Sequence, residues 1–276
     1  MRLILTIAVI SFCVFSLSAQ DIIQSSQNSR QGKFYFYWGW NGAHYTKSNI
    51  HFEGENHKFT LDNVVAKHRP TTFSVDKYFN PINITIPQYS FRIGYFIKDN
   101  VNISFGFDHM KYVVQQNQKV KISGHIENTE TQYDGVYADD DIVIAEDFLQ
   151  LEHTDGLNYL NIELREMSEL YVRSNISINL VKGAGVGLMF PKTDATLINN
   201  PRHDKFHVAG YGVAGMAGIN LAIRKNFFIQ TELKAGFINL PWVRTTSSKS
   251  DKASQNFFFY QYNIVFGTTI NVRNKG

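Results

Sequence analysis

Two short stretches combine histidine with carboxylates, the side chains that general acid–base catalysis uses. One is Asp108-His109 and the other is residues 152–155, with the sequence EHTD. Such groups can transfer a proton near neutral pH or bind a metal ion. Their spacing follows no motif, and the chain contains no Gly-x-Ser-x-Gly for a serine nucleophile. A rim of loop-anchoring hydrogen bonds is therefore the favoured interpretation, and catalysis is the alternative. The catalytic candidates are His109, His153, Asp108, Glu152 and Asp155.

Three consecutive aspartates, Asp139, Asp140 and Asp141, lie in an acidic segment that also holds Glu146 and Asp147. Carboxylate oxygens are the ligands that Ca²⁺ prefers. The spacing does not match an EF-hand loop, so a solvated loop is the favoured interpretation. We expect no metal ion here, with calcium binding by the three aspartates as the alternative.

The remaining motif-like features point to no cofactor. His203 and His207 are four residues apart, a spacing that makes a metal pair only on a helix, whereas the sequence predicts a loop-to-strand junction there. The glycines of residues 183–187 and 210–218 lack the Lys-Ser/Thr that follows a phosphate-binding loop. We interpret them as positions of close strand packing.

Residues 88–114 show the pattern that positions these side chains. Bulky apolar residues occupy positions 89, 91, 93, 95 and 97, whereas Arg92 and small or polar residues alternate with them. After the polar turn 98–100 the alternation resumes, with Asp108 on the polar face. A period of two predicts strands, and the short turn predicts an antiparallel hairpin. An aromatic face opposite a small and polar face is typical of a membrane barrel, with lipid outside.

Eight such strands are predicted, and their connections alternate between long and short. The short turns and both termini then share one side of the membrane, as in bacterial barrels. We expect a short turn near residues 167–169, a polar loop at 193–205 and an acidic loop at 133–141. We also expect pairing of residues 49–52 with 58–62 and of 119–126 with 142–150. The predicted strands are 33–45, 89–97, 101–114, 157–165, one from about 172, 206–223, 227–243 and 257–272.

The N-terminus predicts export. Residues 1–19 contain Arg2, an apolar run and a small-residue end, as a cleaved signal peptide does. Residues 20–31 are polar and predict a flexible lead-in, and residues 32–276 form one barrel domain. Cys13 is the single cysteine, so the mature chain would have no disulfide. The net charge of +3, without a basic stripe, gives no sign of nucleic-acid binding.

This organisation resembles the small outer-membrane β-barrel proteins of the OmpA/OmpX-like kind, over nearly the whole mature chain. The aromatic content and the Ser18-Ala19-Gln20 end of the signal also resemble outer-membrane proteins of Bacteroidota. The resemblance implies contact with outer-membrane lipid and lipopolysaccharide, and recognition by the barrel-insertion machinery. Many such barrels end on an aromatic residue, whereas this chain ends on Gly276, so the insertion signal is expected to be either imperfect or internal, with Phe266 as the internal candidate.

Charged residues of both signs fall on the inward face of the predicted barrel. Eight strands leave a lumen that side chains can fill, so a plug of ion pairs is the favoured interpretation and a narrow ion path the alternative. We expect a non-enzymatic barrel with a structural role, or one that binds a ligand through its external loops. The alternatives are an outer-leaflet lipid-modifying enzyme, such as a lipid A deacylase or acyltransferase, and a small-solute channel. The inward charges are Arg92, Asp108, Glu163, Arg165, Glu232 and Lys234.

Overall fold

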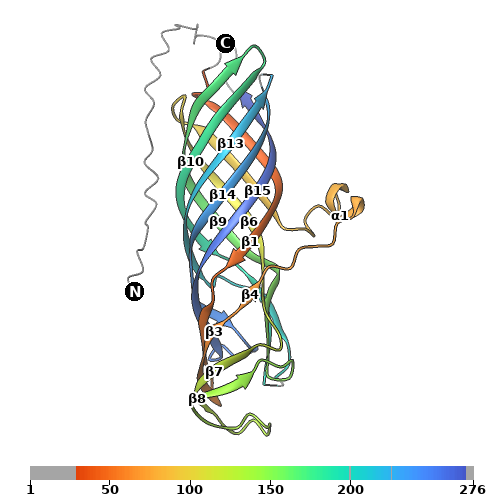
Figure 1. Ribbon diagram of the computed structural model, residues 1–276, viewed down its shortest axis with the longest axis vertical. Coiled ribbons are helices and arrows are strands. Elements are labelled where there is room, and N and C mark those ends of the chain that lie inside the picture. The colour runs from red at the N-terminus through yellow and green to blue at the C-terminus, as the bar shows by residue number, and fades with distance from the viewer. Residues whose placement is uncertain (1–28, 199, 225, 272–276) are drawn as a thin grey trace, which may run out of the picture.

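The computed structural model describes residues 29–198, 200–224 and 226–271. Its main body is an antiparallel barrel of eight strands. In ring order these are β1 (Lys33–Tyr45), β5 (Tyr89–Phe96), β6 (Val101–Val114), β9 (Leu149–Arg173), β10 (Ile176–Met189), β13 (Gly210–Ile223), β14 (Phe227–Arg244) and β15 (Lys252–Asn271). Strand β1 pairs with β5 on one side and with β15 on the other, which closes the ring (Figure 1). The predicted all-β, eight-stranded up-and-down barrel is confirmed.

The connections alternate in length as expected. Short turns lie at one end of the barrel, the upper end in Figure 1, and the long connections lie at the other. The first described residues and the end of β15 both lie at the short-turn end. There Gln31 contacts the β5–β6 turn, and Lys33 lies opposite Asn271 at the end of β15. Short turns on the periplasmic side and long loops outside are the arrangement of bacterial barrels.

The long connections form a second section beyond the membrane, at the lower end in Figure 1. The outer end of β15 pairs with β2, and the sheet continues through β3 and β7 to β8. The hairpin predicted at residues 49–62 is present, with Phe52 opposite Phe59. The additional elements are β2 (Ser48–Glu53), β3 (His57–Val64), β4 (Ala66–Lys67), α1 (Val75–Phe79), β7 (Lys119–Ile126), β8 (Gly135–Val143), β11 (Lys192–Leu197) and β12 (His203–Phe206).

The predicted turn at residues 167–169 is wrong. These residues lie inside β9, which runs for 25 residues before the hairpin turns at Ser174 and Asn175. The polar run suggested a turn because it starts with Glu166, but Glu166 faces outward and forms an ion pair with Lys182 of the next strand. The run therefore lies within the strand, which reverses only after Arg173.

Two predicted loops are strands instead. Residues 135–143 form β8 and pair with β7, so the acidic loop predicted at 133–141 is wrong. The predicted pairing of 119–126 with 142–150 holds only for residues 142 and 143, because the other partners of β7 are residues 135–141. The polar segment 193–205 holds β11 and β12, which pair with each other, and β11 also pairs with β9. In both cases oppositely charged partners on the neighbouring strand neutralise the charged side chains. For example, Lys119 Nζ lies 2.7 Å from the carboxylate of Asp141.

Helix α1 projects sideways from the barrel in the connection between β4 and β5 (Figure 1). Ser74 caps its N-terminus. The rings of Tyr78 and Phe79 pack on Trp40 of β1, with ring centroids 5.8 and 5.3 Å from that of the indole. At the opposite end, Ser29 and Gln31 bind Asp99, so the last residues of the predicted lead-in are held against the barrel. The predicted signal peptide, residues 1–19, lies outside the described residues.

Candidate functional site

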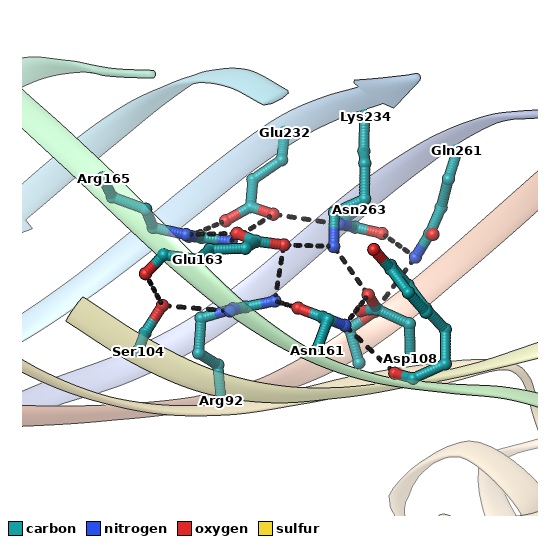
Figure 2. Close-up of polar contacts among 12 residues, drawn as sticks. Arg92, Ser104, Asp108, Asn161, Glu163, Arg165, Glu232, Lys234, Gln261 and Asn263 are labelled. Carbon is teal, nitrogen blue, oxygen red and sulfur yellow. Dashed lines mark hydrogen bonds and ion pairs between the residues drawn. The ribbon is translucent and has the colours of Figure 1, made fainter. Parts of the chain in front are cut away.

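The six inward charges come from four strands and meet inside the barrel (Figure 2). Glu163 is their centre. Its carboxylate accepts hydrogen bonds from Arg92 Nη2 at 2.9 Å and Arg165 Nε at 2.7 Å, and Lys234 Nζ lies 2.9 Å away. All three cations therefore share one anion, and none of the four side chains is more than 2% exposed.

The two other carboxylates complete the network. Arg165 Nη1 donates to Glu232 at 2.7 Å, and Tyr37 donates its hydroxyl proton to the same carboxylate at 3.0 Å. Asp108 accepts from Lys234 Nζ at 2.6 Å. Neutral side chains bind the remaining donors and acceptors. These are Ser104 on Arg92, Asn161 between Arg92 and Asp108, and Gln230 and Asn263 on Glu232.

Because these charged groups are buried, their positive and negative charges must balance. An unpaired ion in a low-dielectric interior costs several kcal/mol, so buried charges must be paired and hydrogen-bonded. Here three cations face three carboxylates, and the set is neutral. Gly106 lies directly beside Arg92, and a methyl group at that position would overlap the guanidinium. The arrangement forms a cross-linked layer that fills the lumen at this level.

Further side chains, most of them uncharged, fill the lumen on both sides of the network. Towards the periplasm, the rings of Tyr35, Phe96 and Phe228 pack together, and Arg30 reaches Asn179 at 2.6 Å. Towards the outside, a large apolar cluster begins directly next to the charges and continues into the outer section. Fully buried members of it include Met110, Tyr112, Phe148, Leu157, Tyr159, Ile238, Leu240 and Phe257.

The five catalytic candidates do not share one site. Asp108 is inside the lumen on Lys234, whereas its neighbour His109 packs on Tyr89, with ring centroids 5.0 Å apart. His109 Nδ1 also lies 2.8 Å from Asn158 Oδ1. The residues of the second stretch have other partners. Glu152 pairs with Arg69 at 3.0 Å, and Asp155 pairs with Lys192 at 2.6 Å.

His153 is fully buried in the outer apolar cluster. Neither ring nitrogen has a hydrogen-bond partner among the residues that the structure describes, and Tyr112 lies against the ring at 5.6 Å. Burial, followed by the nearby charge of His207, lowers the pKa of His153 to about 3. The side chain is therefore neutral at physiological pH and has no carboxylate to orient it as a catalytic base.

The acidic run belongs to β8. Asp141 pairs with Lys119 and Lys121, and Asp139 lies 3.8 Å from Lys121. The hydrogen bond from Lys119 is the main reason why the pKa of Asp141 lies below its usual value. In the described part of the chain, no three His, Cys, Asp or Glu side chains are grouped so as to hold a metal ion.

The neutral members of the network were not among the predicted site residues. Asn161, Gln230 and Asn263 lie on the same inward face as the charges, two residues from Glu163, Glu232 and Gln261 respectively. Their alternation with outward apolar residues was visible, and that parity is the signal that could have added them to the set.

No protein-family model and no curated protein sequence matches the chain. Among solved structures it is similar to outer membrane protein OprG from Pseudomonas aeruginosa, with 10% identity over 89% of this chain and 99% of that chain and a TM-score of 0.42. It is also similar to outer membrane protein AlkL, with 11% identity, 93% and 99% coverage and a TM-score of 0.41. Neisserial surface protein A gives 11% identity, 85% and 96% coverage and a TM-score of 0.34.

The chain's own geometry defines its class. Within residues 29–198, 200–224 and 226–271, no helix is long and apolar enough to cross a membrane. The eight-stranded ring is closed, and its outer wall exposes apolar side chains such as Ile103, Phe105, Ile162 and Leu164, each 46–57% accessible. A closed barrel with an apolar outer band satisfies its backbone within the bilayer. The chain is therefore a small closed β-barrel whose outer wall is suited to a lipid bilayer.

Proposed function

We propose that this protein is a non-enzymatic outer-membrane barrel whose lumen is sealed and whose outer section is a rigid scaffold for contacts at the cell surface. One observation carries the proposal: six charged side chains, each at most 2% exposed, form one neutral network across the lumen. A path for ions needs water along the pore, and these side chains instead bind one another.

The outer section supports a role at the surface. Its sheet is backed by apolar side chains, among them Ile50, Leu61 and Ile122, all fully buried. Such a core keeps the exposed faces in a fixed position, and loops on rigid scaffolds are where proteins most often carry binding function. The exposed face of this sheet is polar, with Lys58, Lys119 and Asp141 on it.

Conductance in a planar lipid bilayer tests the sealed lumen. The purified protein should produce no unitary current under conditions in which a water-filled porin, added in parallel, does. A stable unitary current whose frequency rises with the amount of protein would contradict the proposal and favour the channel alternative. Heat-modifiable electrophoretic mobility of the same preparation establishes that the protein tested is the folded barrel.

A further inference from the structure

A pocket of about 220 Å³ opens on the outer side of β14 and β15, apart from the lumen. Its walls combine cations with apolar side chains and contain no carboxylate. Trp242, which is 65% exposed, is its largest ring. The residues that line it are His207, Val208, Trp242, Arg244, Lys249 and Lys252.

The charges of the pocket are poorly compensated. Arg244 and Lys252 lie directly opposite each other in the β14–β15 register, where like charges destabilise a sheet. Lys252 has one distant carboxylate, that of Glu53 at 3.8 Å. Over the described residues, no ion pair joins Arg244 or Lys249 to a carboxylate. Three cations around one concave surface attract an anion.

The pocket lies where the lipid-facing band ends. Along β13 the outward side chains Val213 and Tyr211 are exposed and apolar, and Val208, which precedes the strand, is exposed at the pocket wall. The backbone N–H of Trp242 donates to the Ala209 carbonyl at 3.2 Å, which holds the indole beside this edge. Tryptophan is enriched at the level of the lipid head groups, and cations just beyond the hydrocarbon region bind anionic head groups.

We propose that Arg244, Lys249 and Lys252, with Trp242 at the edge, bind the phosphate group of an outer-leaflet lipid. Guanidinium and ammonium groups are the usual ligands of phosphate oxygens, and arginine can bind two of them at once. The apolar residues Val208 and Trp242 would contact the part of the same lipid nearest its chains. The site is separate from the lumen, so it stands whether or not the barrel conducts.

Native mass spectrometry of the folded protein in detergent tests this assignment. Phosphatidic acid and diacylglycerol with the same acyl chains differ only in the phosphate, so they serve as the paired probes. We expect bound phosphatidic acid in clear excess over diacylglycerol. The triple variant R244Q/K249Q/K252Q should bind phosphatidic acid roughly a hundredfold more weakly, since each cation near a lipid surface contributes about tenfold or less.

The matched control is K58Q/K119Q/K121Q, which removes the same three positive charges from β3 and β7, away from the pocket. It should bind phosphatidic acid like the unmodified protein. Equal binding by the two triple variants would overturn the proposal, as would equal binding of both lipids. The single variant K249Q, at an exposed loop position, should lose part of the binding and keeps the test available if the triple variant does not fold.

Inorganic phosphate distinguishes the two sources of the anion. Added alone, it should raise the unfolding temperature far less than phosphatidic acid does, because it lacks the chains that contact Val208 and Trp242. If inorganic phosphate stabilises the protein as much as the lipid does, the lipid assignment is wrong and the pocket is a site for soluble anions.

Discussion

The membrane section and the outer section of this barrel have opposite orders of polarity on the same period of two. On β6, outward Ile103 and Phe105 are about half exposed, whereas inward Asn102 and Ser104 are buried. On β2 the inward residues Ile50 and Phe52 are apolar, and outward His51 and Glu53 are exposed. Alternation alone therefore predicts a strand with two unlike faces, and the medium outside decides which of the two faces is apolar.

The change of order occurs between neighbouring residues of a single strand. On β6, Asp108 belongs to the ion-pair network and Met110 to the apolar cluster, and both side chains are fully or almost fully buried. On β15, Gln261 is polar and Phe259 apolar, again both buried. On the inner face of each strand, polar filling therefore changes to apolar filling within two residues.

The largest effect is expected from Glu163→Gln, because it removes the anion shared by three buried cations. Denaturant titration should show that the free energy of unfolding falls by about 3–5 kcal/mol, which is the cost of removing one partner of a buried ion pair. The matched control is Glu166→Gln, three residues along β9, whose outward ion pair with Lys182 is half exposed. It should cost about 1 kcal/mol or less. Equal losses from the two substitutions would contradict the difference between the inner and outer faces.

A substitution in the core of the outer section should destabilise that section and leave the membrane section folded. Leu61→Ala creates a cavity in the outer section, where Leu61 is fully buried, and should cost about 2–5 kcal/mol. We expect limited proteolysis to cut the β2–β3–β7 sheet faster while the heat-modifiable mobility of the barrel is kept. Leu233→Ala, at a lipid-facing position that is 69% exposed, should change neither readout. Loss of barrel mobility together with the outer sheet would show that the sections unfold as one unit.

Acid should weaken the outer section through His153. Its folded pKa of about 3 lies below the usual value of about 6.5, so the unfolded chain binds a proton first as the pH falls. The stability from neutral His153 is complete above pH 6.5 and is lost towards pH 3, at about 1.4 kcal/mol for each pH unit. Proteolysis of the outer section measured between pH 7 and 4 should be less pH-dependent in His153→Phe. The same pH dependence in both proteins would contradict the assignment.

The smallest effect, none at all, is expected on envelope lipid. Because His109 and His153 have separate partners and share no site, His109→Ala and His153→Ala should leave the lipid A mass spectrum of expressing cells unchanged. Cells without the protein should give the same spectrum. A lipid A species that requires the protein and disappears in either variant would favour the lipid-modifying alternative.

Much of the fold could be predicted from alternation, because each strand's faces depend on local sequence. The inward positions of Arg92 and Glu163 followed from that parity. Their contacts with Glu232 and Lys234 did not, because these depend on the register between strands that are distant in sequence and on closure of the ring. Closure is a property of all eight strands together.

The outer section could be predicted less well for a related reason. The acidic residues Asp139 and Asp141 suggested a loop, but the lysines that make a strand possible there, Lys119 and Lys121, lie earlier in the chain on β7. Similarly, Arg244 and Lys252 are separated by a loop and become one basic surface only when β14 and β15 pair. Charge patterns of this kind appear in the sequence only after the strands are aligned.

Access of water to the lumen is the most direct test of the sealed barrel. Ser104 lies inside the network and donates to the Glu163 carbonyl, and cysteine has nearly the same size. In a Cys13→Ser background, Ser104→Cys should not react with a small charged thiol reagent added from either side of the membrane. Ser250→Cys, in an exposed outer loop, should react readily. Reaction of Ser104→Cys at a comparable rate would mean that the lumen holds water and that the account of a sealed barrel is wrong.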